Sequence, residues 1–211
     1  MKVANRRPIR AAIEALEIRP ADAILELGFG PGDGIKRLAA LAPSGKIRGI
    51  DKSPLMLALA RKRNRREIRS GHVILQQASF ENLPLPDACV DKILAVNVVY
   101  FWDDARPVLA EARRVLRPGG LVSIYATDAS AMRSWKFAGP ETHRIFDRRA
   151  LAELLQDGGF DTDQIHVAEV RTVLNVHGLI ATARKCWQAR HVVPPISPPC
   201  CRARDRAEGR R

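Results

Sequence analysis

The stretch from residue 24 to residue 34, ILELGFGPGDG, constrains the fold more than any other part of the sequence. Three apolar residues around Glu26 are typical of a buried strand, and the alternating glycines that follow indicate a tight turn. Apolar residues then recur with helical spacing after Asp33, at Ile35, Leu38, Ala39 and Ala42. A strand, a glycine turn and a helix in this order predict a cradle in which the backbone approaches a ligand closely.

The spacing of the glycines distinguishes between cofactors. They fall at Gly28, Gly30 and Gly32, whereas a dinucleotide fingerprint has its third glycine where Asp33 stands. An acid in the first helical turn repels a pyrophosphate, but a cofactor without phosphates tolerates it. The stretch therefore favours S-adenosylmethionine over NAD.

Strands and helices alternate along most of the chain, which predicts βαβ units in a doubly wound sheet. After a first helix that begins near Pro8, the expected strands lie at about 24–27, 46–51, 73–75, 92–99 and 121–126. Residues 127–146 form an irregular connection, and Asp147 begins a further helix. Two strand-like runs, about 164–170 and 173–183, are separated by so little chain that they predict an antiparallel hairpin at the edge of the sheet.

Composition limits the class of protein. With 211 residues, 46% of them apolar, the chain can bury one sizeable core, and no apolar run is long enough to span a membrane. The four cysteines have no C-x-x-C spacing, so neither a disulfide framework nor a metal site is expected. The start resembles no secretory signal, and we expect a cytoplasmic protein.

The net charge of +12 is unevenly distributed. Residues 183–211 hold eight Lys and Arg against two acids, which is half of the excess, and a second cluster, RKRNRR, covers residues 61–66. A solvated helix face is a better explanation for the cluster than an anionic partner, since cations at the end of a helix complement its dipole and their long side chains can stay solvated. The absence of aromatic residues in the cluster argues against single-stranded nucleic acid as the partner. The end of the chain is rich in Pro and Arg, so we expect a folded domain over 1–185 and a disordered tail over 186–211.

Several further segments together resemble the class I S-adenosylmethionine-dependent methyltransferases, in particular the branch that contains quinone methyltransferases. The resemblance covers roughly residues 8–183. The segments that carry it are ILELGFGPGDG at 24–34, GID at 49–51, ENLPLPD at 81–87, NVVYFW at 97–102 and VLRPGGL at 115–121. It implies a Rossmann-like seven-stranded sheet in the order 3-2-1-4-5-7-6, with strand 7 antiparallel and helices on both faces.

The resemblance also implies a set of cofactor-binding positions. The glycines would line the methionine half of the cofactor, Glu26 would hold its amino group, and Asp51 would accept hydrogen bonds from the ribose hydroxyls. The family often has an acid for the adenine amino group where this chain has Ser79. The full set is Glu26, Gly28, Gly30, Gly32, Asp51, Lys52, Met56, Ser79, Phe80 and Asn97. A core role for Met56, and a turn or capping role for Asp51, remain as alternatives.

Methyl transfer from a sulfonium needs alignment more than acid–base chemistry, so no catalytic residue is assigned. His143, Tyr100 and Asp128 are weak candidates, and residues 100–102 form either the wall of the acceptor pocket or part of the core. We expect a small-molecule acceptor. The alternatives are an acceptor in RNA, protein or membrane lipid, reached through the basic surfaces, and a cofactor-binding domain without catalysis.

Overall fold

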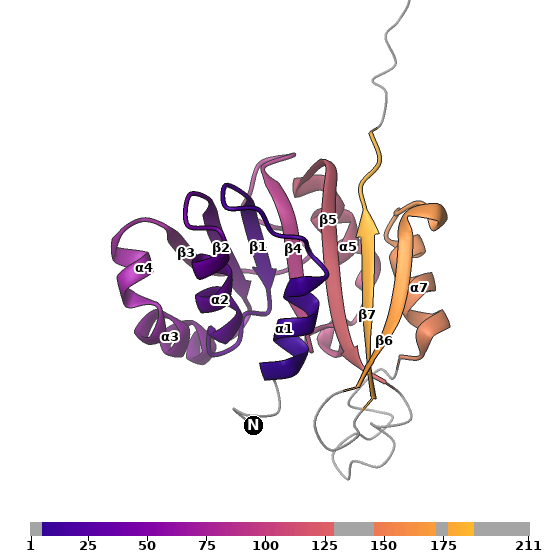
Figure 1. Ribbon diagram of the computed structural model, residues 1–211, viewed down its shortest axis with the longest axis horizontal. Helices are drawn as coiled ribbons and strands as arrows, with labels where there is room; N and C mark the ends of the chain where they lie inside the picture. Colours follow the sequence, from indigo (N-terminus) through magenta and orange to yellow (C-terminus); the bar gives the residue numbers. More distant parts are fainter. Residues whose placement is uncertain (1–5, 129–145, 172–176, 188–211) are drawn as a thin grey trace, which may run out of the picture.

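The computed structural model describes residues 6–128, 146–171 and 177–187, and it contains one seven-stranded sheet with helices on both faces (Figure 1). The strands are β1 (Ala23–Leu27), β2 (Lys46–Asp51), β3 (Val73–Gln77), β4 (Val90–Val96), β5 (Leu116–Thr127), β6 (Ile165–Arg171) and β7 (His177–Arg184). The helices are α1 (Arg6–Glu14), α2 (Asp33–Leu41), α3 (Pro54–Arg63), α4 (Arg65–Arg69), α5 (Ala105–Val115) and α7 (Arg148–Asp157), with short 3₁₀ turns at Val99–Phe101 and Thr162–Gln164.

The sheet order is β3-β2-β1-β4-β5-β7-β6, which confirms the expected topology. The strands from β3 to β5 are parallel, and β7 is antiparallel to both β5 and β6. Because the parallel strands share one direction, the loops that follow β1, β2 and β4 meet at the same edge of the sheet, where ligands of open α/β sheets bind.

Two apolar clusters hold the layers together. One joins α1, α2 and α3 to one face of the sheet, and the other joins α5 and α7 to the opposite face. Alternation along β1 divides the two clusters, since Ile24 packs on the first side and Leu25 on the second, both fully buried. Glu26, next along the strand, points to the side of Ile24.

The predicted bounds were wrong at two strands. β4 ends at Val96, three residues before the expected end, because Asn97 has a φ of 53° and a 3₁₀ turn begins at Val99. β5 begins at Leu116, five residues before the expected start, because the Pro-Gly-Gly segment already runs in the strand, beside a register shift in β4. The basic cluster at 61–66 spans two helices, α3 and α4, that are separated at Asn64.

The predicted hairpin is present as β6 and β7, although residues 172–176 lie outside the described part. The expected tail, residues 186–211, is described only at Cys186 and at Trp187, whose side chain is exposed. Among the described helices none is long and apolar enough to cross a membrane. The same part of the chain has no group of His, Cys, Asp or Glu side chains that could hold a metal ion.

Candidate active site

The glycine loop joins β1 to α2, and its three alternating glycines all have positive φ: 67° at Gly28, 50° at Gly30 and 83° at Gly32. A Cβ at Gly28 would come within 2.3 Å of Val98, and one at Gly32 within 2.6 Å of the side-chain nitrogen of Asn64. A Cβ at Gly30 would meet no atom within 4 Å. The loop is therefore closed against the protein at its two ends and open in its middle, as a ligand cradle requires.

Asp51 fixes the open middle of the loop from the end of β2. Its Oδ2 accepts a hydrogen bond from the Gly30 amide at 2.9 Å, and its Oδ1 accepts one from the Ser53 amide at 2.9 Å. The carboxylate is buried, with 8% of its residue surface exposed. A carboxylate has about four lone-pair sites, so each oxygen keeps one for a further donor. The capping alternative is partly realised, and it leaves room for a ligand.

Glu26 is the least satisfied polar side chain near the loop. The residue is 3% exposed, and its Oε2 has no hydrogen-bond partner among the described residues. Its carboxylate lies against the first turn of α2, where a Cβ at Gly34 would come within 2.1 Å of Oε1. Burial, and then the negative charges of Asp51 and Asp33, raise the pKa of Glu26 well above its usual value. A buried carboxylate in this condition is suited to a cationic ligand.

The glycine loop is also held by the end of α3. The two side chains that do so belong to the last residue of the helix and to its C-cap, and the sequence alone assigned no role in the site to either. Arg63 forms an ion pair with Asp33, and Asn64 donates from Nδ2 to the carbonyl of Gly32 at 3.1 Å. Asn64 is fully buried, which distinguishes it from the exposed cations around it. Only its position inside a run of basic residues could have marked it in the sequence.

The segment after β3 brings the carboxylate of Glu81 next to Ser79 and Lys52. The Ser79 hydroxyl donates to Glu81, and Lys52 pairs with the same carboxylate at 2.8 Å. The Lys52 bond lowers the pKa of Glu81, which is therefore ionised at neutral pH. Lys52 also lies 5.2 Å above the ring of Phe80, a buried core residue. Sequence inspection of Ser79 alone missed Glu81, two positions later.

The turn after β4 is held by Tyr100. Its hydroxyl donates to Oδ1 of Asn97 at 3.2 Å and accepts from the amide of Thr127 at the end of β5. The Asn97 amide in turn donates to the carbonyl of Tyr125 at 3.0 Å. Burial raises the pKa of Tyr100 above that of a free tyrosine. Tyr100 is thus placed to tie two strand ends together and is poorly suited to act as a base.

The remaining predicted residues differ in how they are placed. Met56 is half-buried and packs against the α1–α3 core, and Trp102, like Tyr100, lies in the core, while Phe101 is 59% exposed. Asp128 directly follows β5 and forms an isolated β-bridge with Phe146. His143 lies outside the described residues.

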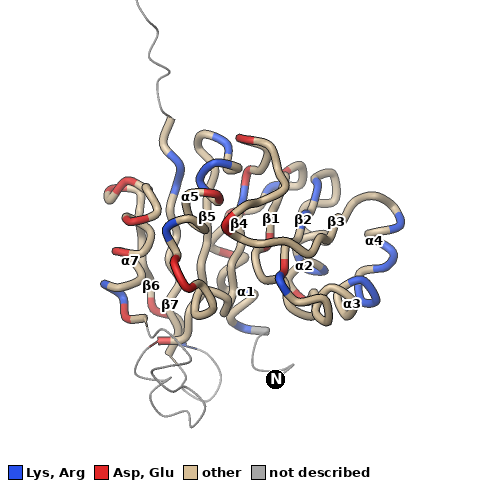
Figure 2. Tube along the Cα trace, turned by 180° about the vertical axis from the view of Figure 1, so that it is seen from behind, with Lys and Arg blue, Asp and Glu red and all other residues tan. Residues whose placement is uncertain are grey.

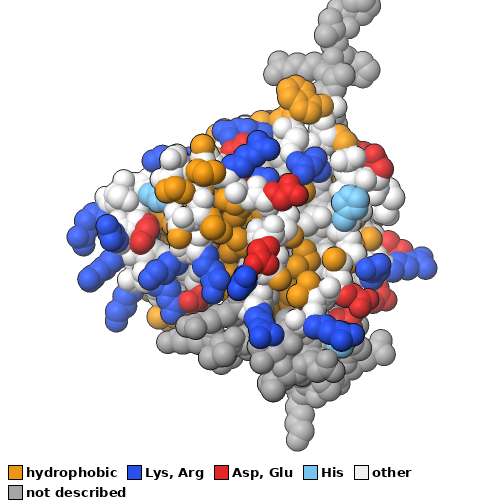
Figure 3. Space-filling model, in the orientation of Figure 1, with side chains coloured by type: hydrophobic (Ala, Val, Ile, Leu, Met, Phe, Trp, Pro, Cys, Tyr) orange, Lys and Arg blue, Asp and Glu red, His pale blue; other side chains and the backbone are white. Residues whose placement is uncertain are grey.

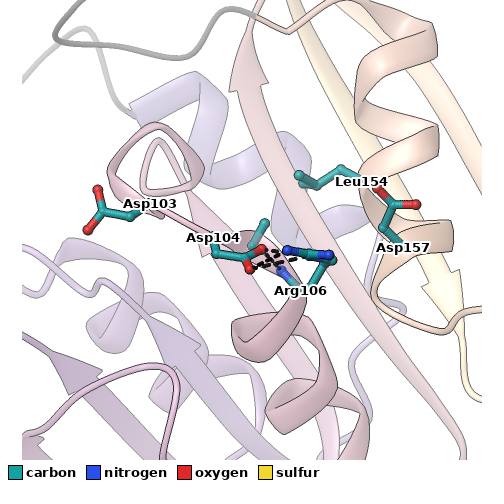
Figure 4. A pocket seen from close by; sticks show the side chains of 6 residues that line it. Asp103, Asp104, Arg106, Leu154 and Asp157 are labelled. Carbon is teal, nitrogen blue, oxygen red and sulfur yellow. Dashed lines mark hydrogen bonds and ion pairs between the residues drawn. The ribbon is translucent and has the colours of Figure 1, made fainter.

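A cavity of about 420 Å³ lies beside the turn after β4, between the start of α5 and the C-terminal half of α7. Figure 4 shows Asp104 and Arg106 facing each other across hydrogen bonds, with Asp103 pointing away from them. Asp104 caps α5, since its Oδ1 accepts a hydrogen bond from the Arg106 amide at 3.0 Å. The cavity is lined chiefly by charged side chains on this helix pair, and none of the cofactor-loop residues lines it.

Comparison with known proteins gives a consistent family. The family described as "Methyltransferase domain" matches residues 25–124. "Uncharacterized methyltransferase YdaC" of Bacillus subtilis is 32% identical over 185 residues, which cover 88% of this chain and 95% of the relative. The "Ubiquinone/menaquinone biosynthesis C-methyltransferase UbiE" of Acidiphilium cryptum is 36% identical, over 85% of this chain and 79% of the relative.

Solved structures share the fold at low identity. The one described as "Crystal Structure of the [4+2]-Cyclase SpnF" has a TM-score of 0.71 and 20% identity, covering 85% of this chain and 81% of that one. A protein described as a cyclase thus has the same architecture, so the fold alone does not determine the reaction.

Proposed function

The chain belongs to the class I S-adenosylmethionine-dependent methyltransferases, and from this premise we propose that it methylates a small, apolar, ring-containing acceptor. The observation that carries the proposal is Phe101, an aromatic side chain that is 59% exposed at the carboxyl edge of the sheet. It lies one turn from Val98, which closes the glycine loop at Gly28. An exposed ring next to the cofactor loop provides a stacking surface for a planar acceptor. The relative named as a quinone-biosynthesis C-methyltransferase supports the same class.

The residues around the loop fit the cofactor. Glu26 supplies a buried acceptor for the amino group of the methionine moiety, and Asp51 supplies two lone pairs for ribose hydroxyls. Gly30 leaves open space above the backbone between them. Glu81, held by Ser79 and Lys52, takes the place of the family's acid at the adenine amino group. Bound S-adenosylmethionine supplies a methyl group on a sulfonium, whose departure leaves a neutral thioether.

The protein's contribution to the reaction is alignment. The acceptor atom forms a bond to the methyl carbon as the carbon–sulfur bond breaks, and the acceptor's proton leaves to solvent. Holding the acceptor in line can contribute about 7–11 kcal/mol, whereas a single base contributes about 10²–10⁴-fold. Tyr100 is engaged by Asn97 and Thr127, so it acts here by holding the turn that carries Phe101.

An acceptor screen tests the proposal. The full chain is incubated with labelled S-adenosylmethionine and hydroquinones, catechols, small amines, total RNA and a protein extract, with product mass as the readout. We expect methylated ring compounds, and Phe101→Ser should raise the KM for them while the affinity for S-adenosylhomocysteine stays unchanged. Methylation confined to RNA or protein would contradict the proposal. If the chain binds the cofactor but methylates none of these acceptors, the result would favour a cofactor-binding domain without catalysis.

The adenine contact has its own test. Glu81→Gln should weaken S-adenosylhomocysteine binding by about 1.5–3 kcal/mol, the range for hydrogen bonds to charged groups. S-inosylhomocysteine carries a carbonyl oxygen in place of the amino group, and a glutamine can donate to this oxygen whereas a carboxylate cannot, so Glu81→Gln should not weaken its binding. Lys52→Gln is the matched control for loss of the exposed ion pair, which is worth about 1 kcal/mol or less. An equal loss for both ligands would remove Glu81 from the adenine site.

A further inference from the structure

One surface of the molecule combines exposed leucines with a dense group of cations. α3 and α4 contact β3 at the edge of the sheet. Figure 2 shows that Lys and Arg positions are frequent along these two helices, and Figure 3 shows Lys and Arg side chains gathered on this side of the molecule. We define the α3–α4 surface as the exposed residues Leu55, Leu59, Arg61, Lys62, Arg65, Arg66 and Arg69. Leu55 is 63% exposed and Leu59 is 43% exposed, so both present apolar area to the outside.

The cations of this surface are not neutralised by ion pairs. None of the five forms a salt bridge with any described residue, whereas Arg10, Arg106, Arg114, Arg117 and Arg149 each pair with a carboxylate elsewhere. Arg63, between them in the sequence, is the exception, since it turns inward to Asp33. Glu67 is the one acid within α3 and α4. The surface therefore keeps a net positive charge of four.

The leucines and the cations follow one another along the helix. Leu55 and Leu59 are separated by four residues and Lys62 follows three residues later, spacings that put all three on one face of α3. The exposed leucines therefore adjoin exposed cations along this helix, and a bilayer interface offers acyl chains to the leucines and anionic headgroups to the cations. A surface for single-stranded nucleic acid would be expected to offer aromatic side chains for stacking, and none of the seven residues is aromatic.

From this juxtaposition of exposed leucines and unpaired cations we infer that the α3–α4 surface docks the protein on membranes that contain anionic phospholipids. Charge complementarity selects the partner, because each Lys or Arg near a negatively charged leaflet adds to the binding. The surface also adjoins the cofactor site, since Met56 in the first turn of α3 follows Asp51 by five residues. Docking would thus bring the carboxyl edge of the sheet close to the bilayer, where apolar molecules dissolve.

Vesicle sedimentation with the full chain tests this inference. The vesicles are made of phosphatidylcholine alone or of phosphatidylcholine mixed with phosphatidylglycerol. We expect binding to the mixed vesicles only, decreasing with salt. Lys62→Glu/Arg66→Glu should weaken it at least about tenfold. Leu55→Ser/Leu59→Ser should weaken it several-fold and leave the remainder salt-sensitive.

A matched control separates the surface from net charge. Arg148→Glu/Arg171→Glu changes the charge by the same amount on α7 and β6, at the opposite edge of the sheet, where both residues are exposed and have no ion-pair partner among the described residues. This variant should bind mixed vesicles within about threefold of the unaltered chain. The arginine-rich sequence 202–211 is identical in all variants. Melting temperature and S-adenosylhomocysteine affinity should be unchanged throughout, since every altered side chain is exposed.

Three outcomes would overturn the inference. One is an unaltered chain that ignores the mixed vesicles, and another is an equal loss of binding in the control variant. The third is binding to an RNA oligomer, but not to vesicles, that is lost in Lys62→Glu/Arg66→Glu. None of these outcomes depends on which acceptor the enzyme methylates, so the inference and the proposed function can fail separately.

Discussion

The two halves of the sheet's carboxyl edge are built by different means. Around β1 and β2 the site is made of backbone: three left-handed glycines, and an aspartate whose two oxygens hold the amides of Gly30 and Ser53. Around β4 and β5 it is made of side chains, with Tyr100 joining Asn97 to Thr127. A glycine in the sequence indicates where the backbone takes an unusual conformation, whereas no residue type indicates which distant side chain it will contact. The difference explains why the glycines and Asp51 could be predicted from the sequence, whereas the hydrogen bonds that Tyr100 makes to Asn97 and Thr127 could not.

Gly28→Ala against Gly30→Ala should give the largest contrast. Both substitutions force an alanine into a left-handed conformation, at a cost of roughly 1–2 kcal/mol. Gly28→Ala also places a Cβ 2.3 Å from Val98, and overpacking of this kind lowers stability by about 1–3 kcal/mol more. Gly30→Ala meets no protein atom, so it should retain most of the stability and instead lose cofactor affinity, by about tenfold or more.

Chemical denaturation and titration with S-adenosylhomocysteine measure the two effects separately. The expected pattern is an unstable Gly28→Ala and a stable, weakly binding Gly30→Ala. A Gly30→Ala variant with full affinity would show that the open space in the loop is not where the cofactor lies.

Asp51→Ala is expected to have the next largest effect, because it removes backbone contacts and ligand contacts together. Loss of hydrogen bonds to a charged group should weaken cofactor binding by roughly 1.5–3 kcal/mol. The amides of Gly30 and Ser53 lose their acceptor as well, so the melting temperature should fall. Calorimetric titration with S-adenosylhomocysteine, and with NAD as a ligand expected to be silent, makes the measurement. A folded variant with unchanged affinity would exclude Asp51 from the site.

The sheet topology could be predicted more accurately than the ends of the individual strands. Alternation of strands and helices predicted a doubly wound sheet, and the resemblance to the methyltransferases implied its strand order. The early end of β4 was not predicted, because the left-handed conformation of Asn97 has no signature in an apolar pattern. In the site, Asp51 and the glycines follow from local sequence. Asn64 and Glu81 do not, since each acts only through a neighbour that folding brings to it, the Gly32 carbonyl and the Ser79 hydroxyl.

The contribution of Glu26 to the pH dependence of stability has a fixed sign. Folding raises the pKa of this carboxyl, chiefly by burial, so the folded chain favours the protonated form. Stability should therefore be greatest below the unfolded pKa of about 4.3 and fall as the pH rises through the folded pKa. In Glu26→Gln this component should vanish, which denaturant unfolding between acidic and neutral pH measures.

Binding of the cofactor's ammonium group should reverse the preference of Glu26 and release a proton. Calorimetry in two buffers of different ionisation enthalpy would detect the release, and Glu26→Gln should abolish it. Release of the same size in the variant would assign the proton to another group.

Tyr100→Phe should change catalysis less than the substitutions above change cofactor binding, and it tests how the β4–β5 half of the site works. The variant keeps the ring, including its tilted contact with Phe146, and removes only the hydroxyl that Asn97 and Thr127 share. Leaving the buried Thr127 amide without this acceptor costs about 1–3 kcal/mol of stability. If Tyr100 positions the turn, the KM for the cofactor rises while the shape of the kcat profile over pH 6–9 stays unchanged, because burial keeps the phenol protonated there.

His143→Ala should then lower kcat less than Phe101→Ser raises the acceptor KM. Loss of a titration in the kcat profile of Tyr100→Phe would instead make its hydroxyl a proton-transfer group, and a collapse of kcat in His143→Ala alone would give that role to the histidine. Either result would show that acid–base chemistry, rather than alignment, dominates this half of the site.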